Sequence, residues 1–172
     1  QIASTPALAV TVLLTLGVIF VNGWTDAPNA IATAVSTRAM KPRHAIIMAA
    51  VFNFLGLLLV SLVSTAVAHT IFSMVDFGGN SHQALTALMA AMVAIIVWGA
   101  AAWWFGIPTS QSHSLIAGLT GAAIAVQGGL DAINGAEWMK VIYGLALSIG
   151  LGFVMGWVLC KLVSILFAAA NR

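Results

Sequence analysis

Residues 44–68 read HAIIMAAVFNFLGLLLVSLVSTAVA, a continuous run without any Asp, Glu, Lys or Arg. About 20 apolar residues are enough for a helix to cross the hydrocarbon core of a bilayer. In lipid the backbone must satisfy its own hydrogen bonds, which leaves helices or closed barrels as spanning structures. The run lacks the alternation of apolar and polar residues that a barrel strand requires. The segment is therefore predicted to be a transmembrane helix.

The composition extends this prediction to the rest of the chain. Of 172 residues, 62% are hydrophobic and only 6% are charged, with a mean hydropathy of +1.08. Soluble domains carry about a quarter charged residues, so we expect an all-α integral membrane protein. The net charge of +2 and the absence of basic clusters argue against nucleic acid as a partner. The single cysteine, Cys160, is expected to be a small apolar residue in a helix.

Three further apolar runs are predicted to form helices, at residues 6–21, 84–105 and 140–170. No basic segment precedes the first of them, so it is not expected to be a signal peptide. The loop at 38–43 is basic, whereas the connection at 69–83 has neither Lys nor Arg. Since Lys and Arg favour the cytoplasmic side, the first loop is expected inside the cell and the second outside. We predict one multi-pass domain over residues 1–172 in the cell membrane.

Two polar segments that contain proline interrupt the apolar runs, at residues 22–29 and 106–114. Each is predicted to be a break in a helix. A break of this kind is either an interrupted span or a re-entrant hairpin, and the sequence leaves both open. Discontinuous helices in transporters place half-helix ends and polar side chains at membrane depth.

The first segment, Asn22-Gly23-Trp24-Thr25-Asp26-Ala27-Pro28-Asn29, contains a carboxylate beside amide and hydroxyl groups. Pro28 suits a first helical turn, so a half-helix is predicted to begin near Asp26, with Thr25 or Asp26 as its N-cap. The N–H groups of such an end attract anions. Asp26 can also neutralise a coupling cation, with Asn22 and Asn29 as further ligands. The alternative is an ordinary helix cap at the membrane surface.

The second segment, Gly106-Ile107-Pro108-Thr109-Ser110-Gln111-Ser112-His113-Ser114, offers hydroxyl, amide and imidazole groups. Converging neutral donors suit a tetrahedral oxyanion and also allow it to leave, as transport requires. The alternative is a solvated serine-rich loop. His113 is expected to be a hydrogen-bonded structural residue rather than a proton carrier. No G-x-S-x-G hydrolase motif is present, and we do not expect an enzyme.

Together the two segments resemble a known family. Residues 22–33, NGWTDAPNAIAT, resemble the G-x-N-D-x-A-N-A signature of the PiT inorganic phosphate transporters, and residues 106–118, GIPTSQSHSLIAG, are similar to their second signature, G-[LI]-P-x-S-x-[ST]-H-x-x-x-G. The matching residues are Gly23, Asp26, Asn29, Pro108, Ser110, Ser112 and His113. The resemblance implies a secondary transporter of phosphate coupled to sodium or protons. It also implies alternating access, a fold of two inverted repeats and a dimer.

The resemblance and the chemistry of the two segments together define the expected sites. The phosphate site is predicted to contain Thr25, Asp26, Asn29, Ser110, Gln111 and Ser112. The coupling cation is predicted at Asn22, Asp26 and Asn29. His113 and Thr109 are expected in a shell that surrounds the two sites. No cofactor and no metal other than bound sodium is expected.

Some residues depart from the family pattern and leave alternatives open. Thr25 stands where the family usually has Asn, Pro28 where Ala is common, and Gln111 where Ser or Thr is usual. A carrier of sulfate or another oxyanion is therefore one alternative, and a membrane assembly subunit without transport activity is another. The chain contains one set of motifs, so it corresponds to one half of a transporter. The other half is expected as a second repeat in the same or a separate chain.

Overall fold

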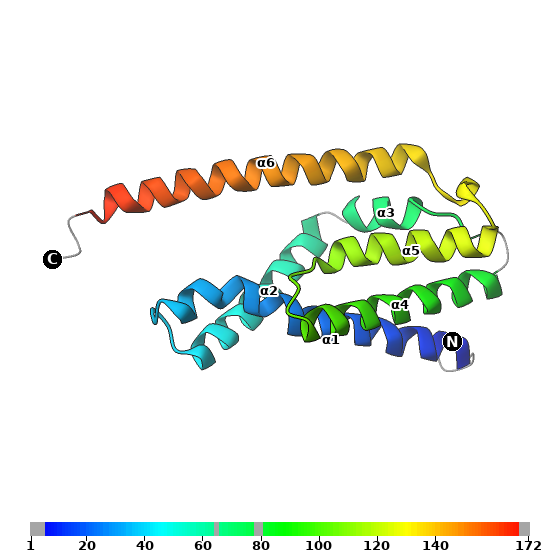
Figure 1. Cartoon of the computed structure of the whole chain (residues 1–172), viewed down its shortest axis with the longest axis horizontal. Helices are drawn as coiled ribbons and strands as arrows, with labels where there is room; N and C mark the ends of the chain where they lie inside the picture. The colour runs from blue at the N-terminus through cyan, green and yellow to red at the C-terminus, as the bar shows by residue number, and fades with distance from the viewer. Residues whose placement is uncertain (1–5, 64–65, 78–80, 169–172) are drawn as a thin grey trace. The chain divides into compact units, whose positions relative to one another are not determined.

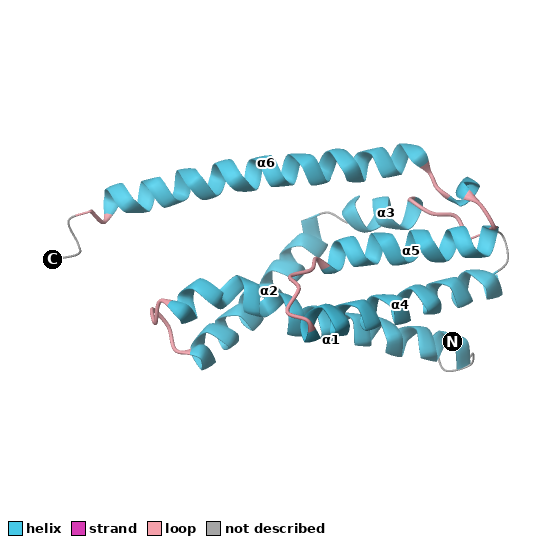
Figure 2. Ribbon diagram, viewed as in Figure 1, coloured by secondary structure: helices cyan, strands magenta, loops and turns pink. Residues whose placement is uncertain are grey.

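The computed structural model describes residues 6–63, 66–77 and 81–168, and within these ranges the chain is helical (Figures 1 and 2). The elements in order are α1 (Pro6–Ser36), α2 (Pro42–Val63), α3 (Ala66–Ser73), α4 (Ser81–Trp104), α5 (Gln111–Gln127), the short 3-10 helix η2 (Leu130–Ala132) and α6 (Gly135–Leu166). Four of them, α1, α2, α4 and α6, are long and apolar enough to cross a membrane. The prediction of an all-α, multi-pass membrane protein is confirmed. The sidedness of the loops stays a prediction.

Helix α1 runs without interruption through the first polar segment, with Pro28 inside it. The predicted break at 22–29, and the half-helix capped by Thr25 or Asp26, are therefore wrong. Thr25 Oγ1 donates to the carbonyl oxygen of Val21, one turn back, at 3.0 Å, so the hydroxyl lies along the helix instead of capping a new one. Proline removes one N–H donor, but a continuous helix still satisfies most backbone groups of a segment in lipid.

The second polar segment does interrupt the helical conformation. Helix α4 ends at Trp104 and α5 begins at Gln111. The chain turns back between them, so that α5 packs along α4 (Figure 1). The break predicted within residues 106–114 is present as a turn between two packed helices.

The residues divide into two compact units, 1–134 and 135–172. In the first unit α4 is the central helix, since it packs against both α1 and α5, while α2 packs against α1. Glycines bring these helices close together. A Cβ atom on Gly17 of α1 would lie 3.0 Å from Ile96 Cδ1 of α4. A Cβ atom on Gly118 of α5 would lie 3.0 Å from Ile95 Cγ1 of α4. Small residues are typical of helix contacts in membranes. The buried face of α4 consists of Ala87, Ala91, Met92, Ile95, Gly99 and Ala102.

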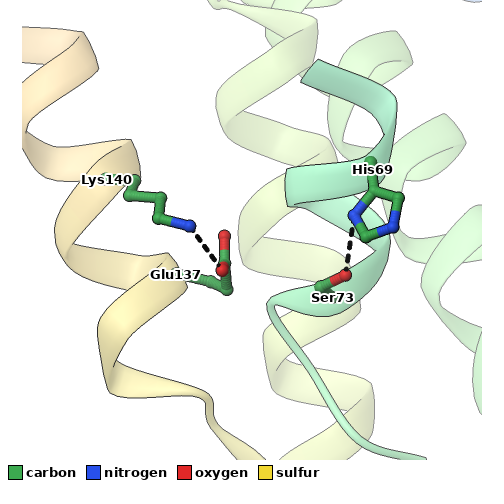
Figure 3. A network of polar contacts seen from close by, with 4 residues as sticks. All are labelled: His69, Ser73, Glu137 and Lys140. Carbon is green, nitrogen blue, oxygen red and sulfur yellow. Dashed lines mark hydrogen bonds and ion pairs between the residues drawn. The ribbon is translucent and has the colours of Figure 1, made fainter. Parts of the chain in front are cut away.

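Backbone hydrogen bonds join the segment that follows α3 to the end of η2 and the residues after it. Asp76 N donates to Ala132 O at 2.8 Å, and Asn134 N donates to Met74 O at 3.0 Å. Met74 and Ala132 are buried at this junction. Within α3 itself, the side chains of His69 and Ser73 form a hydrogen bond of 3.2 Å (Figure 3).

The described part of the second unit contains helix α6. Its first turn contains an ion pair of 2.6 Å between Lys140 Nζ and Glu137 Oε1 (Figure 3). Near its other end the ammonium group of Lys161 lies 5.0 Å from the ring centroid of Trp157. Gly152 and Gly156 of this helix lie four positions apart, and each has open space where a Cβ atom would lie.

Candidate functional site

A cavity of about 220 Å³ lies where the two polar segments of the sequence meet. Helix α1 and the connection between α4 and α5 reach the same cavity because α1 packs against α4. Its volume leaves room for several groups of the size of water, each of which takes about 30 Å³ in the liquid. The lining consists of Thr25, Pro28, Asn29, Ala102, Trp103, Gly106, Ile107, Pro108 and Thr109.

The connection between α4 and α5 begins with a left-handed helix stop at Gly106. This residue has a φ of 66°, a conformation that favours glycine. Gly106 N donates to Trp103 O at 3.1 Å, and Ile107 N donates to Ala102 O at 2.8 Å. This pair of bonds is the Schellman motif, and a proline commonly follows it because proline cannot continue the helix. The sequence Gly-Ile-Pro therefore ends α4 locally and forms one wall of the cavity.

Ser110 starts the next helix as its N-cap. Its φ and ψ are −98° and 123°, and its Oγ accepts a hydrogen bond from His113 N at 3.4 Å. Ser114 Oγ donates to Ser110 O at 3.0 Å. Serine is among the preferred N-cap residues, so a helix start after Pro108 follows from the local sequence. The cap also brings the positive end of the α5 dipole close to the connection.

A wall of the cavity is aromatic. Trp103 lines the cavity, and its ring centroid lies 4.5 Å from that of Trp24 with an interplanar angle of 55°. Tilted aromatic pairs at this distance are favourable. Sequence reasoning missed this role, since paired tryptophans at the end of an apolar run are typical of a membrane interface. The position of Trp103 three residues before Gly106 was the available signal.

A side-chain hydrogen bond joins α4 to the connection. Trp98 Nε1 donates to Thr109 Oγ1 at 2.9 Å. Thr109 lines the cavity, although the sequence assigned it only to a surrounding shell. The sequence pattern did not predict this hydrogen bond, because Trp98 and Thr109 lie eleven positions apart in different structural elements.

Gln111 is buried, with 6% of its surface exposed, and is not part of the cavity lining. A Cβ atom on Gly99 would lie 3.4 Å from its Oε1 atom, so the amide packs against the glycine face of α4. Within the described part of the chain, neither Nε2 nor Oε1 of Gln111 has a hydrogen-bond partner. A buried amide in this state costs about 1–3 kcal/mol.

The structure brings together some of the predicted site residues and leaves others outside the lining. Thr25, Asn29 and Thr109 line the cavity together. Asp26 is half-buried in α1 beside Thr25, whereas Ser112 and His113 are exposed in the first turn of α5. The predicted residues outside the cavity lining are Asn22, Asp26, Ser110, Gln111, Ser112 and His113. The roles predicted for all of these residues in binding phosphate or a cation stay predictions.

Comparison with known proteins adds to this geometry. The family described as the phosphate transporter family matches residues 22–172. The match therefore includes both polar segments and all of the cavity lining. No solved structure matches the chain.

Individual relatives have related descriptions. A protein of Bacillus subtilis (strain 168), described as a probable low-affinity inorganic phosphate transporter, is 41% identical over 160 residues, which are 93% of this chain and 46% of that protein. A protein of Streptomyces halstedii with the same description is 39% identical over 159 residues, 90% of this chain and 72% of its own length. The low-affinity inorganic phosphate transporter PitA of Escherichia coli (strain K12) is 38% identical over 144 residues, 79% and 29% of the two lengths. The chain thus spans about half the length of the Bacillus relative.

Proposed function

The chain belongs to the phosphate transporter family, and we propose that the protein containing it is a secondary transporter that moves inorganic phosphate across a membrane. The proposal is supported most directly by the cavity where Thr25 and Asn29 of α1 meet residues 106–109. Both polar segments lie in spans or turns of a multi-pass membrane protein. Relatives described as inorganic phosphate transporters support phosphate as the substrate.

The chemistry of the lining suits an anion that must bind and leave again. Asn29 offers amide N–H donors and Thr109 offers a hydroxyl, and neither is charged. The lining contains no Lys or Arg, which would hold an oxyanion through stronger, charge-assisted bonds. We infer that neutral donors and the nearby N-terminus of α5 stabilise the anion together.

We propose that the coupling ion, sodium or a proton, binds near Asp26. The carboxylate follows Thr25 directly in α1, and Thr25 Oγ1 already donates its proton to Val21 O. The lone pairs of that hydroxyl remain available to a cation. An anion site and a cation site that share one helix turn would neutralise each other, which lowers the cost of placing either charge at membrane depth.

The chain covers 46% of its Bacillus relative, so the transport unit is proposed to need a second half. We propose an inverted repeat, in the same or a separate chain, that closes the cavity from the other side and permits alternating access. A dimer of such units is part of the same proposal.

Uptake of radiolabelled phosphate into proteoliposomes tests the proposal, using the whole protein that contains this chain. We expect uptake to rise with an inward gradient of sodium or of protons and to persist in excess sulfate. Asn29→Ala should lower uptake, while Asn53→Ala should not, because Asn53 lies in α2 and its side-chain amide donates to Ala49 O of the same helix.

Each alternative function has its own outcome in the same assay. Flux that ignores both gradients would identify a passive anion channel. Loss of phosphate uptake in excess sulfate would identify a broader oxyanion carrier. Absence of uptake in the wild-type protein would favour a membrane assembly subunit.

A further inference from the structure

The hydrogen bond from Trp98 Nε1 to Thr109 Oγ1, 2.9 Å long, joins a residue outside the cavity lining to one inside it. We infer that Trp98 is a positioning residue, which aims the hydroxyl proton of Thr109 at a tetrahedral oxyanion in the cavity. The inference rests on the proposed transport of phosphate. It adds to that site an orienting residue in α4 and places Thr109 in direct contact with the anion rather than in a surrounding shell.

The direction of the bond follows from the chemistry of the two groups. An indole N–H can only donate, so Thr109 Oγ1 must be the acceptor. A hydroxyl has one proton and two lone pairs, and here one lone pair faces Trp98. The proton of Thr109 must therefore point away from Trp98. Because Thr109 lines the cavity and Trp98 does not, the directions left to the proton include the cavity.

Thr25 carries the other hydroxyl of the lining, and the proton of that hydroxyl is already in a hydrogen bond. Thr25 Oγ1 donates its proton to Val21 O at 3.0 Å, so it would have to give up that bond before donating to an anion. Within the described residues, Thr109 Oγ1 makes no such bond to a carbonyl. Thr109 is thus the lining hydroxyl whose proton is available at the lowest cost.

The surroundings of Thr109 also restrict its movement. Pro108 fixes its own φ and removes one degree of freedom just before Thr109. Threonine is branched at Cβ, which limits its χ1 rotamers. With the indole holding Oγ1, little conformational freedom remains to be lost when an anion binds, and such preorganisation raises affinity. A fixed O–H dipole that points into the cavity attracts an anion and repels a cation.

A purely structural role for Trp98 makes a different prediction. Its side chain is 51% exposed, and tryptophan is common at membrane interfaces for reasons unrelated to substrate. If Trp98 only packs or anchors the helix, removing its indole N–H and removing the Thr109 hydroxyl would have independent effects on phosphate binding. If Trp98 acts through Thr109, removing both groups should weaken phosphate binding no more than removing the hydroxyl alone does.

The experiment is a double-mutant cycle with Trp98→Phe and Thr109→Val in the whole protein. Phosphate binding is measured in detergent with radiolabelled phosphate, and uptake is measured in proteoliposomes. We expect Thr109→Val to raise the KM for phosphate about tenfold or more, as for a lost hydrogen bond to a charged group. Trp98→Phe should raise KM about three- to tenfold with the maximal rate retained, which is the pattern of lost binding. Trp104→Phe is the matched control, because Trp104 is 77% exposed and outside the lining.

The result that supports the inference is a double variant no worse than Thr109→Val alone. Effects on KM that multiply, or a Trp98→Phe protein with the KM of the wild type, would overturn it while leaving phosphate transport intact. A wild-type protein that neither binds nor transports phosphate would overturn the proposed function and this inference with it. If Trp98→Phe is not recovered as a folded protein, Trp98→Tyr keeps an aromatic ring without the indole N–H and completes the same cycle.

Discussion

Gly99 of α4 faces Val21 of α1 so closely that a Cβ atom on residue 99 would lie 2.6 Å from Val21 Cγ1. Real Cβ atoms do not approach other atoms this closely, so the Val21 side chain or one of the two helices would have to shift. The same glycine makes room for the amide of Gln111. The approach of α1 to α4, which joins the two polar segments at one cavity, thus depends on the absence of a side chain at position 99.

We predict that Gly99→Ala destabilises the protein by about 1–3 kcal/mol, as overpacking of a close contact does. Lower thermal stability of the purified protein in detergent is the measurement. Gly121→Ala in α5 is the matched control, because a Cβ atom there meets nothing within 4 Å. Adding Val21→Ala to Gly99→Ala should restore much of the loss. Equal stability of the Gly99 and Gly121 variants would contradict the prediction.

A second prediction concerns the stop of α4. Gly106 and Gly128 both have positive φ, 66° and 74°, with open space around the missing Cβ. Replacing either by alanine should cost about 1 kcal/mol of stability from backbone strain alone. Only Gly106→Ala should also raise the KM for phosphate, because Gly106 lines the cavity. An unchanged KM in Gly106→Ala, or an equal rise of the KM in Gly128→Ala, would contradict the prediction. Either result would show that the segment between α4 and α5 does not shape the phosphate site at Gly106.

A third prediction concerns the coupling ion. Asp26→Asn removes the negative charge that is proposed to balance the cation, with little change in shape. We expect the dependence of phosphate uptake on the sodium or proton gradient to weaken while thermal stability is retained. Asp131→Asn is the control, since Asp131 is exposed in η2 and outside the cavity lining. The same gradient dependence in Asp26→Asn and in the wild type would remove Asp26 from the coupling site.

The fourth prediction concerns the buried amide of Gln111. In the described part of the chain its polar atoms have no partner, so Gln111→Leu should raise stability in the absence of phosphate by about 1–3 kcal/mol. Gln127→Leu, at the exposed end of α5, should change stability by less than about 0.5 kcal/mol. A lower melting temperature for Gln111→Leu would show that the amide has a partner in the whole protein. That outcome would contradict the prediction that the Gln111 amide is buried without a hydrogen-bond partner.

Much of the helical architecture could be predicted because its causes are local. The apolar run at 44–68 is sufficient for a spanning helix, and α2 covers Pro42–Val63. The stop at Gly106 and the cap at Ser110 follow from left-handed glycine and N-cap chemistry, which involve only neighbouring residues. The break predicted at residues 22–29 is wrong because the prediction also relied on local signals. Proline and capping residues are signals of a helix end, but a chain with apolar or small residues on both sides continued as one helix.

Composition, hydropathy and short motifs were thus enough to establish a helical membrane protein, a break in the helix within 106–114 and the resemblance to phosphate transporters. Three relationships became visible only in the packed structure. Asn29 and Thr109 line one cavity, Trp98 Nε1 donates to Thr109 Oγ1, and the Gln111 amide packs against Gly99. The physical reason is distance along the chain. Caps and apolar runs depend on interactions within a few residues, whereas the shape of a cavity depends on how the surfaces of separate helices fit. That fit is set by small features, such as a missing Cβ atom at position 99, whose effect appears only when α1 lies against α4.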